Sequence, residues 1–164
     1  MNIVQPAYPP LNGEPAYRDL SVVVDEIIHH SAGPTTQTVL DIDAFHRARG
    51  YVMIGYTLII GADGTVYQGR PLEMVPAAAQ GFNTISVDIC LIGNFQPDDP
   101  GYTGMPTAAQ IQSLKDASVY VHQKCPNIER TLGHRDLMSD ACPGDLLYAL
   151  IPSIRAYVAG KLHL

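Results

Sequence analysis

The feature that most constrains the fold is an irregular alternation of short apolar strands with amphipathic helices. The first clear strand is predicted over residues 21–28, which are mostly apolar and β-branched. The apolar run at 87–92 is interrupted only by Asp88, which is typical of a central strand. Residues 56–60 and 65–67 flank an Asp-Gly turn and predict a hairpin, the strongest such signal in the chain.

The helices are predicted by their end signals. Residues 38–49 have an N-cap threonine and carry Val39, Ile42 and Phe45 at three-residue spacing. A second helix opens at Pro106-Thr107, and residues 145–162 are expected to be helical with a kink or restart at Pro152. These elements together predict a single α/β domain, in which helices pack on the faces of a central mixed β-sheet.

Composition excludes several classes of function. The chain has 164 residues and a net charge of −6, which argues against nucleic acid as a partner. No apolar run approaches the roughly 20 residues of a membrane span, so no membrane partner is expected. The N-terminus lacks a basic segment followed by an apolar one, so no signal peptide is expected. Three cysteines make a disulfide framework unlikely to be the basis of the fold. Residues 1–20, rich in Pro, Gly and Tyr, are expected to form an extended arm, and residues 21–164 the folded domain.

Three side chains form a candidate metal site. His29 ends the first strand, His134 follows a short strand predicted over 130–133, and Cys142 comes eight residues later. Two imidazoles and one thiolate are good zinc ligands, and three protein ligands leave an open position, as in catalytic zinc sites. Spacing alone leaves a second interpretation open, in which the histidines are ordinary strand-end residues and the cysteine is a small buried side chain.

Several segments together resemble a known family. They share its order and cover roughly residues 22–150: Ile27-Ile28-His29-His30-Ser31-Ala32, Gly55-Tyr56-Thr57-Leu58-Ile59-Ile60, Asp63-Gly64-Thr65-Val66-Tyr67-Gln68-Gly69-Arg70, Gly81-Phe82-Asn83, Ser86 to Phe95, Gly133-His134-Arg135-Asp136 and Ala141 to Asp145. The set is similar to the zinc-dependent N-acetylmuramoyl-L-alanine amidases of the phage-lysozyme and peptidoglycan-recognition-protein superfamily. Residues 21–164 would then be the amidase domain.

The resemblance implies specific roles. It makes His29, His134 and Cys142 the ligands of Zn²⁺, and it makes Tyr56 a catalytic residue. It implies cleavage of the amide between N-acetylmuramic acid and L-alanine in bacterial peptidoglycan. Relatives that only recognise peptidoglycan typically lack the cysteine ligand, so Cys142 favours catalysis.

Two departures from the family pattern affect the expected site. Many phage-type members carry a histidine before the Gly-x-Asn segment, whereas residues 76–81 contain none. The position two before the cysteine is often lysine or threonine in relatives and is Asp140 here, which makes Asp140 a candidate acid/base. By the same resemblance, Asn83 and Phe82 are candidate substrate contacts.

The remaining histidines are expected to have other roles. His30 follows His29 in an extended chain, so the two side chains face opposite ways and are not expected to share one metal. His46 is expected to be a packed, hydrogen-bonded helix residue, and His122 a polar position on its helix.

Two alternatives to a phage-type lysin remain at this stage. One is a peptidoglycan-binding module without turnover. The other is a cytoplasmic amidase that recycles wall fragments, although that subgroup usually has aspartate as its third ligand. A lysin would be made in the host cytoplasm, would act at the cell wall after release, and is expected to be a monomer.

Overall fold

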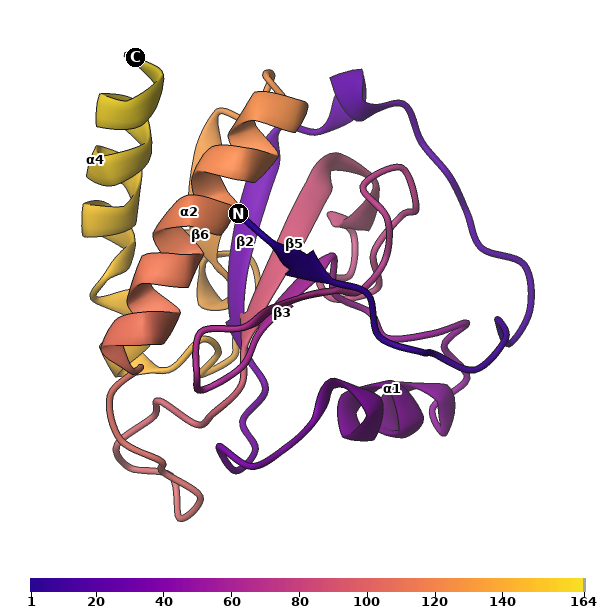
Figure 1. The fold of residues 1–164 in the computed structure, drawn as a ribbon, viewed down its shortest axis with the longest axis horizontal. Helices are drawn as coiled ribbons and strands as arrows, with labels where there is room; N and C mark the ends of the chain where they lie inside the picture. The colour runs from indigo at the N-terminus through magenta and orange to yellow at the C-terminus, as the bar shows by residue number, and fades with distance from the viewer. Residues whose placement is uncertain (164) are drawn as a thin grey trace.

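The fold is built on a six-stranded mixed sheet (Figure 1). The computed structural model describes residues 1–163. The strands lie in the order β1-β4-β3-β5-β2-β6, and only the β3–β4 pair is antiparallel. Their bounds are β1 Ile3–Val4, β2 Asp25–His30, β3 Leu58–Ile60, β4 Val66–Gln68, β5 Ser86–Leu91 and β6 Arg130–Gly133. The predicted mixed sheet, the hairpin and the central position of β5 are therefore confirmed.

Helices cover both faces of this sheet. The bounds are α1 Val39–Arg47, α2 Ala108–Lys124, α3 Asp145–Tyr148 and α4 Ile151–Leu162. Helices α2 and α4 lie side by side on one face, and α1 lies on the other side of the sheet (Figure 1). Thr38 and Thr107 each close a capping box at the start of α1 and α2. Thr38 is the predicted N-cap, and Thr107 lies where the second helix is predicted to open. Pro152 stands in the first turn of α4, which confirms the expected restart.

Strand alternation divides the interior into two clusters. On β5, Val87, Ile89 and Leu91 belong to the cluster beneath α2 and α4. The intervening residues, Asp88 and Cys90, therefore face the α1 side. The same period on β2 puts Ile28 in the α2 cluster and turns His29 to the α1 side. The α2 face of β5 is thus apolar along the strand, while the α1 face of β2 and β5 carries the polar side chains of the site.

Two boundaries and one side-chain placement differ from the sequence-based predictions. Residues Leu20–Val22 form a 3-10 turn capped by Asp19, so the first strand begins only at Asp25. Tyr56 precedes β3 rather than starting it. Phe45 was expected on the apolar face of α1 but is 51% exposed, because it lies at the rim of a cavity rather than on the sheet.

The N-terminal arm lies against the body of the protein. Its strand β1 pairs in parallel with β4, and the Tyr8 hydroxyl donates a hydrogen bond to the Gln68 carbonyl at 2.8 Å. Arg18 donates to the Asn83 carbonyl at 2.6 Å. The three cysteines are free thiols, as expected. Within the described residues, no helix combines the length and apolar character that a bilayer crossing requires.

Candidate metal centre and active site

The two candidate histidine ligands leave the same edge of the sheet. Strands β2 and β6 are parallel, and their last paired residues are Ile28 and Gly133. The next residues are His29 and His134, whose ring centroids lie 4.7 Å apart. Carboxyl ends of parallel strands meet at one edge, which is why residues 105 positions apart in the chain become neighbours here.

A tight loop brings Cys142 back to this edge. The backbone N–H of Arg135 donates to the Cys142 carbonyl at 2.8 Å, and the N–H of Gly133 donates to Asp136 Oδ2 at 2.8 Å. Gly144 closes the loop at a φ of +86°, where an added Cβ would stand 2.5 Å from the Phe95 carbonyl carbon. Only glycine fits this conformation and this approach without strain. The loop therefore fixes the thiol above the two strand ends.

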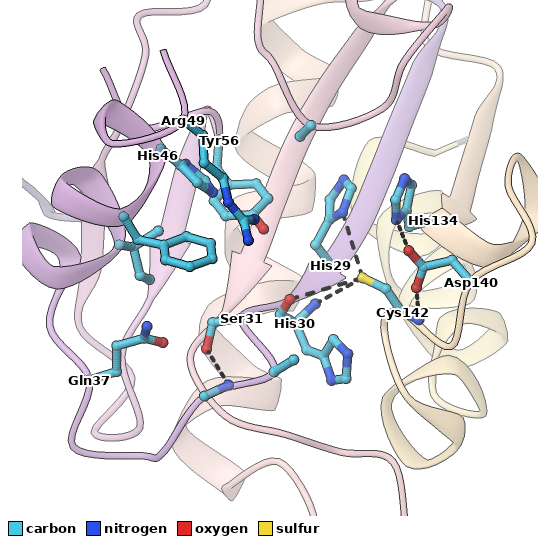
Figure 2. Close-up of a pocket in the computed structure, with 15 residues that line it drawn as sticks. His29, His30, Ser31, Gln37, His46, Arg49, Tyr56, His134, Asp140 and Cys142 are labelled. Atoms are coloured by element: carbon cyan, nitrogen blue, oxygen red, sulfur yellow. Dashed lines mark hydrogen bonds and ion pairs between the residues drawn. The ribbon is translucent and has the colours of Figure 1, made fainter. Parts of the chain in front are cut away.

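The donor atoms of the three residues converge. One ligand atom from each of His29, His134 and Cys142 lies within 4.8 Å of the others, and the Cys142 Sγ is 3.7 Å from His29 Nδ1. Nε2 of His134 is buried and has no hydrogen-bond partner among the described residues. His30 is not part of this group, and its Nδ1 accepts the Phe95 N–H at 3.2 Å. Figure 2 shows the sulfur between the two imidazoles.

Charge at the site is set by these contacts. Burial lowers the pKa of His29, but hydrogen bonds to Asp88 and Cys142 outweigh it and raise that pKa to about 10. Burial raises the pKa of Cys142, but the neighbouring imidazoles of His134 and His29 bring it down to about 7. A thiol with so low a pKa is readily converted to the thiolate, which is the form that binds metals.

The two predicted catalytic side chains lie beside this group. The Tyr56 ring centroid is 5.3 Å from that of His29, and burial raises the pKa of Tyr56 well above 10. Its phenol therefore stays protonated and can donate a hydrogen bond. Asp140 Oδ2 lies 3.5 Å from His134 Nδ1, and its Oδ1 accepts the Cys142 N–H at 2.6 Å.

A cavity of about 510 Å³ opens over these residues, a size typical of ligand sites. Its inner wall carries His29, Tyr56, His134, Asp140 and Cys142 (Figure 2). Five residues from three separate parts of the chain, all singled out from the sequence, are thus brought together.

The opposite wall comes from α1 and was not predicted. His46 lines it and accepts the Gly55 N–H at its Nδ1, 2.9 Å away, so the expected hydrogen bond exists, but the ring also faces the cavity. Burial lowers the pKa of His46 to about 4, so the ring is neutral at neutral pH. Arg49 stacks on the Phe45 ring at 3.9 Å on the rim of the cavity. Only the helical spacing of these residues, three and four apart, signalled a shared face.

The two predicted substrate contacts lie outside this cavity. Asn83 lines a neighbouring hollow that shares His134, and its Oδ1 accepts the N–H groups of Ala78 and Ala79 at 3.0 and 2.9 Å. Its carboxamide oxygen is thus committed to shaping the loop that borders the site. Phe82 is half-buried just before the short 3-10 turn Asn83–Ile85.

Comparisons with known proteins agree with this geometry. The family described as N-acetylmuramoyl-L-alanine amidase matches residues 23–145. The endolysin of Enterobacteria phage T3 is 35% identical over 119 residues, which are 71% of this chain and 77% of the endolysin. Peptidoglycan-recognition protein LB of Drosophila melanogaster is 32% identical over 136 residues; the match covers 77% of this chain but 57% of that protein.

Solved structures extend the match to the whole chain. The N-acetylmuramoyl-L-alanine amidase LysC from Clostridium intestinale URNW superimposes with a TM-score of 0.81 and 29% identity, over 100% of this chain and 99% of that one. The fold expected from the sequence is thereby confirmed. The chain belongs to the N-acetylmuramoyl-L-alanine amidase family.

Proposed function

We propose that the chain cleaves the amide between the lactyl group of N-acetylmuramic acid and L-alanine in bacterial peptidoglycan, with a zinc ion held by His29, His134 and Cys142. The observation that carries the proposal is the convergence of these three donors on the floor of a cavity. A structural likeness adds to it. Peptidoglycan recognition protein-LE, solved in complex with tracheal cytotoxin, a monomeric diaminopimelic acid-type peptidoglycan, has a TM-score of 0.81 to this chain and 26% identity.

The donor set fits zinc. Zn–S bonds of about 2.3 Å and Zn–N bonds of about 2.0–2.1 Å at a tetrahedral angle separate sulfur and nitrogen by about 3.6 Å. The Cys142 Sγ and His29 Nδ1 are 3.7 Å apart. The unpartnered, buried Nε2 of His134 is the third donor, and a ligand there would relieve the cost of leaving it unpaired. When bound at such a site, zinc supplies a water activated near neutral pH and an electrophile for the amide carbonyl.

Tyr56 stabilises the developing oxyanion in this proposal. Its phenol is held beside His29, and its raised pKa keeps the proton in place throughout the reaction. A fixed hydroxyl donor that strengthens its hydrogen bond as negative charge develops lowers the barrier, and does so more effectively in a partly buried site than in water.

Asp140 carries a proton to the departing amine. The carboxylate is 43% exposed on the side of the cavity, so it can exchange protons with solvent, and one oxygen stays anchored on the Cys142 N–H. Asp140→Asn keeps an acceptor for that N–H and removes the titratable group. We expect turnover to fall at least about 100-fold, with loss of one limb of the pH–rate profile. A variant with the wild-type profile would remove Asp140 from the acid/base role.

Substrate contacts from the loop on the other side of the site complete the proposal. Asn83 Oδ1 is occupied by backbone N–H groups, so a contact to the stem peptide would come from its Nδ2. Phe82, next to it, would provide an apolar contact.

We also propose a setting for this activity. The similarity to a phage endolysin supports a lysin made in the host cytoplasm that reaches the wall after release and acts as a monomer. A binding module without turnover is the second candidate, because several relatives are named as recognition proteins. The complete set of three donors favours catalysis over binding alone.

Mass spectrometry of digested cell walls tests the proposal. Purified peptidoglycan is incubated with the protein, with the protein plus a chelator, and with chelator-treated protein to which zinc is restored. We expect free stem peptides beginning with L-alanine and intact glycan chains, no products with chelator, and recovery with zinc. Cleavage within the peptide or the glycan would contradict the proposed bond. Retention on the walls without products would favour the binding module.

A further inference from the structure

Asp88 is a buried carboxylate on the cavity side of the sheet. It lies on β5, opposite Ile27 of β2, and the next pair along the two strands on the same face is His29 with Cys90. Its side chain is fully buried, at 0% exposure. From this placement we infer that Asp88 is a positioning residue, which holds the ring and the tautomer of His29 so that Nδ1 is presented to the metal. The inference rests on the zinc site proposed above.

The hydrogen bonds around Asp88 leave His29 one arrangement. Asp88 Oδ1 lies 2.8 Å from His29 Nε2, and Oδ2 accepts the Ser86 hydroxyl at 2.7 Å. An ionised carboxylate only accepts hydrogen bonds, so Nε2 must carry the proton. When His29 gives up its second proton on metal binding, that proton therefore leaves Nδ1, which then has the free lone pair. That nitrogen is the one 3.7 Å from Cys142 Sγ.

Asp88 is also held rigidly itself. The Ser86 hydroxyl fixes one oxygen, and the backbone N–H of Asp88 donates to Thr57 Oγ1 at 3.3 Å. A metal-binding histidine whose second nitrogen donates to a fixed carboxylate is both oriented and made more basic. His134 has a looser counterpart, because its Nδ1 is 3.5 Å from the half-exposed Asp140. Asp88 is therefore the stronger of the two constraints on ligand geometry.

A purely structural role would be difficult to reconcile with this environment. The other β5 side chains named in the core are apolar, and a buried carboxylate in such a strand costs stability compared with a well-packed apolar residue. The hydrogen bond between Asp88 and the proposed zinc ligand His29 offers a functional reason for burying a carboxylate here. The two roles differ in what they predict: a structural residue affects folding, whereas a positioning residue affects metal affinity in folded protein.

The test compares three variants in the full chain. Asp88→Ala removes the acceptor and the charge, and Asp88→Asn removes the charge while retaining the shape. Asp25→Asn is the matched control, because Asp25 is a fully buried carboxylate at the far end of β2, paired with Arg130. Zinc affinity is measured by competition with a chromophoric chelator at a fixed neutral pH. Urea unfolding of the metal-free proteins measures folding separately.

We expect Asp88→Ala to bind zinc about 10- to 100-fold more weakly than wild type, Asp88→Asn to fall between them, and Asp25→Asn to stay within about twofold. If Asp88→Ala does not fold, the isosteric Asp88→Asn carries the test, with zinc binding several-fold weaker expected. Wild-type affinity in the folded Asp88 variants would overturn the inference. Failure of wild-type protein itself to bind zinc would instead contradict the proposed function.

Discussion

The two ends of the β2–β6 strand pair differ in whether their buried polar groups have hydrogen-bond partners. At the amino end, Arg130 donates to both oxygens of the buried Asp25 at 2.7 Å. At the carboxyl end, His29 and His134 follow the last register pair, and His134 Nε2 has no partner among residues 1–163. One end is closed by its own side chains, and the other leaves a donor atom facing a cavity. The same parallel register thus serves stability at one end and ligand binding at the other.

A second buried carboxylate, Glu26, lies near the amino end of the strand pair but on the opposite face of the sheet from the cavity. Glu26 is fully buried, and its Oε2 accepts the Thr131 hydroxyl at 2.8 Å, while its Oε1 has no partner among the described residues. Its other neighbour is His122 of α2, at 3.3 Å, which makes that histidine a contact of the sheet rather than a simple polar position. Glu26 faces α2, away from the cavity that holds the three donors.

Removing the sulfur donor is expected to have the largest effect. Cys142→Ala eliminates one of three ligands, so zinc binding should fail and wall-lytic activity should drop at least about 100-fold. Cys125→Ala, at another buried free cysteine, is the control and should retain activity. Turbidity loss of purified walls and zinc content measure the two effects. Full lysis by Cys142→Ala would show that activity does not depend on the three metal donors at the carboxyl end of the strand pair.

Removing one hydroxyl is expected to have the next largest effect. Tyr56→Phe should lower turnover about 100-fold because an oxyanion donor is lost, while zinc binding stays at the wild-type level. Tyr157→Phe is the control, since that hydroxyl contacts Asp116 on α2. Single-turnover assays with a muropeptide and zinc titrations separate the two readouts. Unchanged turnover would exclude Tyr56 from the reaction.

The closed end predicts a change in stability without a change in activity. Arg130→Ala leaves the Asp25 carboxylate buried without its partner, and the free energy of unfolding should fall, by less than for a fully buried pair because Arg130 is half-exposed. Urea unfolding measures the loss. Zinc affinity should stay unchanged, and a large drop in affinity would show that the two ends are not independent.

A smaller effect is expected from the α1 wall of the cavity. Because burial lowers the pKa of His46 from 6.5 to about 4, the unfolded chain binds more protons than the folded one between these values. The contribution of neutral His46 to the free energy of unfolding is therefore complete above pH 6.5 and decreases as the pH falls toward 4. Unfolding free energies of wild type and His46→Gln across this range should differ in slope, by a total on the order of 1 kcal/mol. Parallel pH profiles would exclude His46 as the source.

Local signals in the sequence predicted local structure well. Thr38 and Thr107 have the residues of a capping box three positions later, and Asp63-Gly64 is compatible with few structures other than a tight turn. The metal donors were identified through a resemblance that spans many segments. Spacing alone did not identify them, because their approach depends on the β2–β6 register and on the loop that ends at Gly144.

The sequence alone did not indicate that Asp88 contacts His29 or that His46 and Phe45 border the cavity. Asp88 was noted only as an interruption of an apolar strand, because its contact with His29 joins residues 59 positions apart. His46 and Phe45 were assigned to the buried face of a helix, whereas that face borders a cavity. Such roles depend on tertiary packing, which periodicity along one element does not encode.

The central claim is that one zinc ion bound by two imidazoles and a thiolate makes this chain active on cell walls. Metal analysis of purified, active protein, followed by chelation and zinc restoration, tests it most directly. We expect one zinc per chain, loss of lysis on chelation and recovery on restoration. Undiminished lysis by metal-free protein would contradict it.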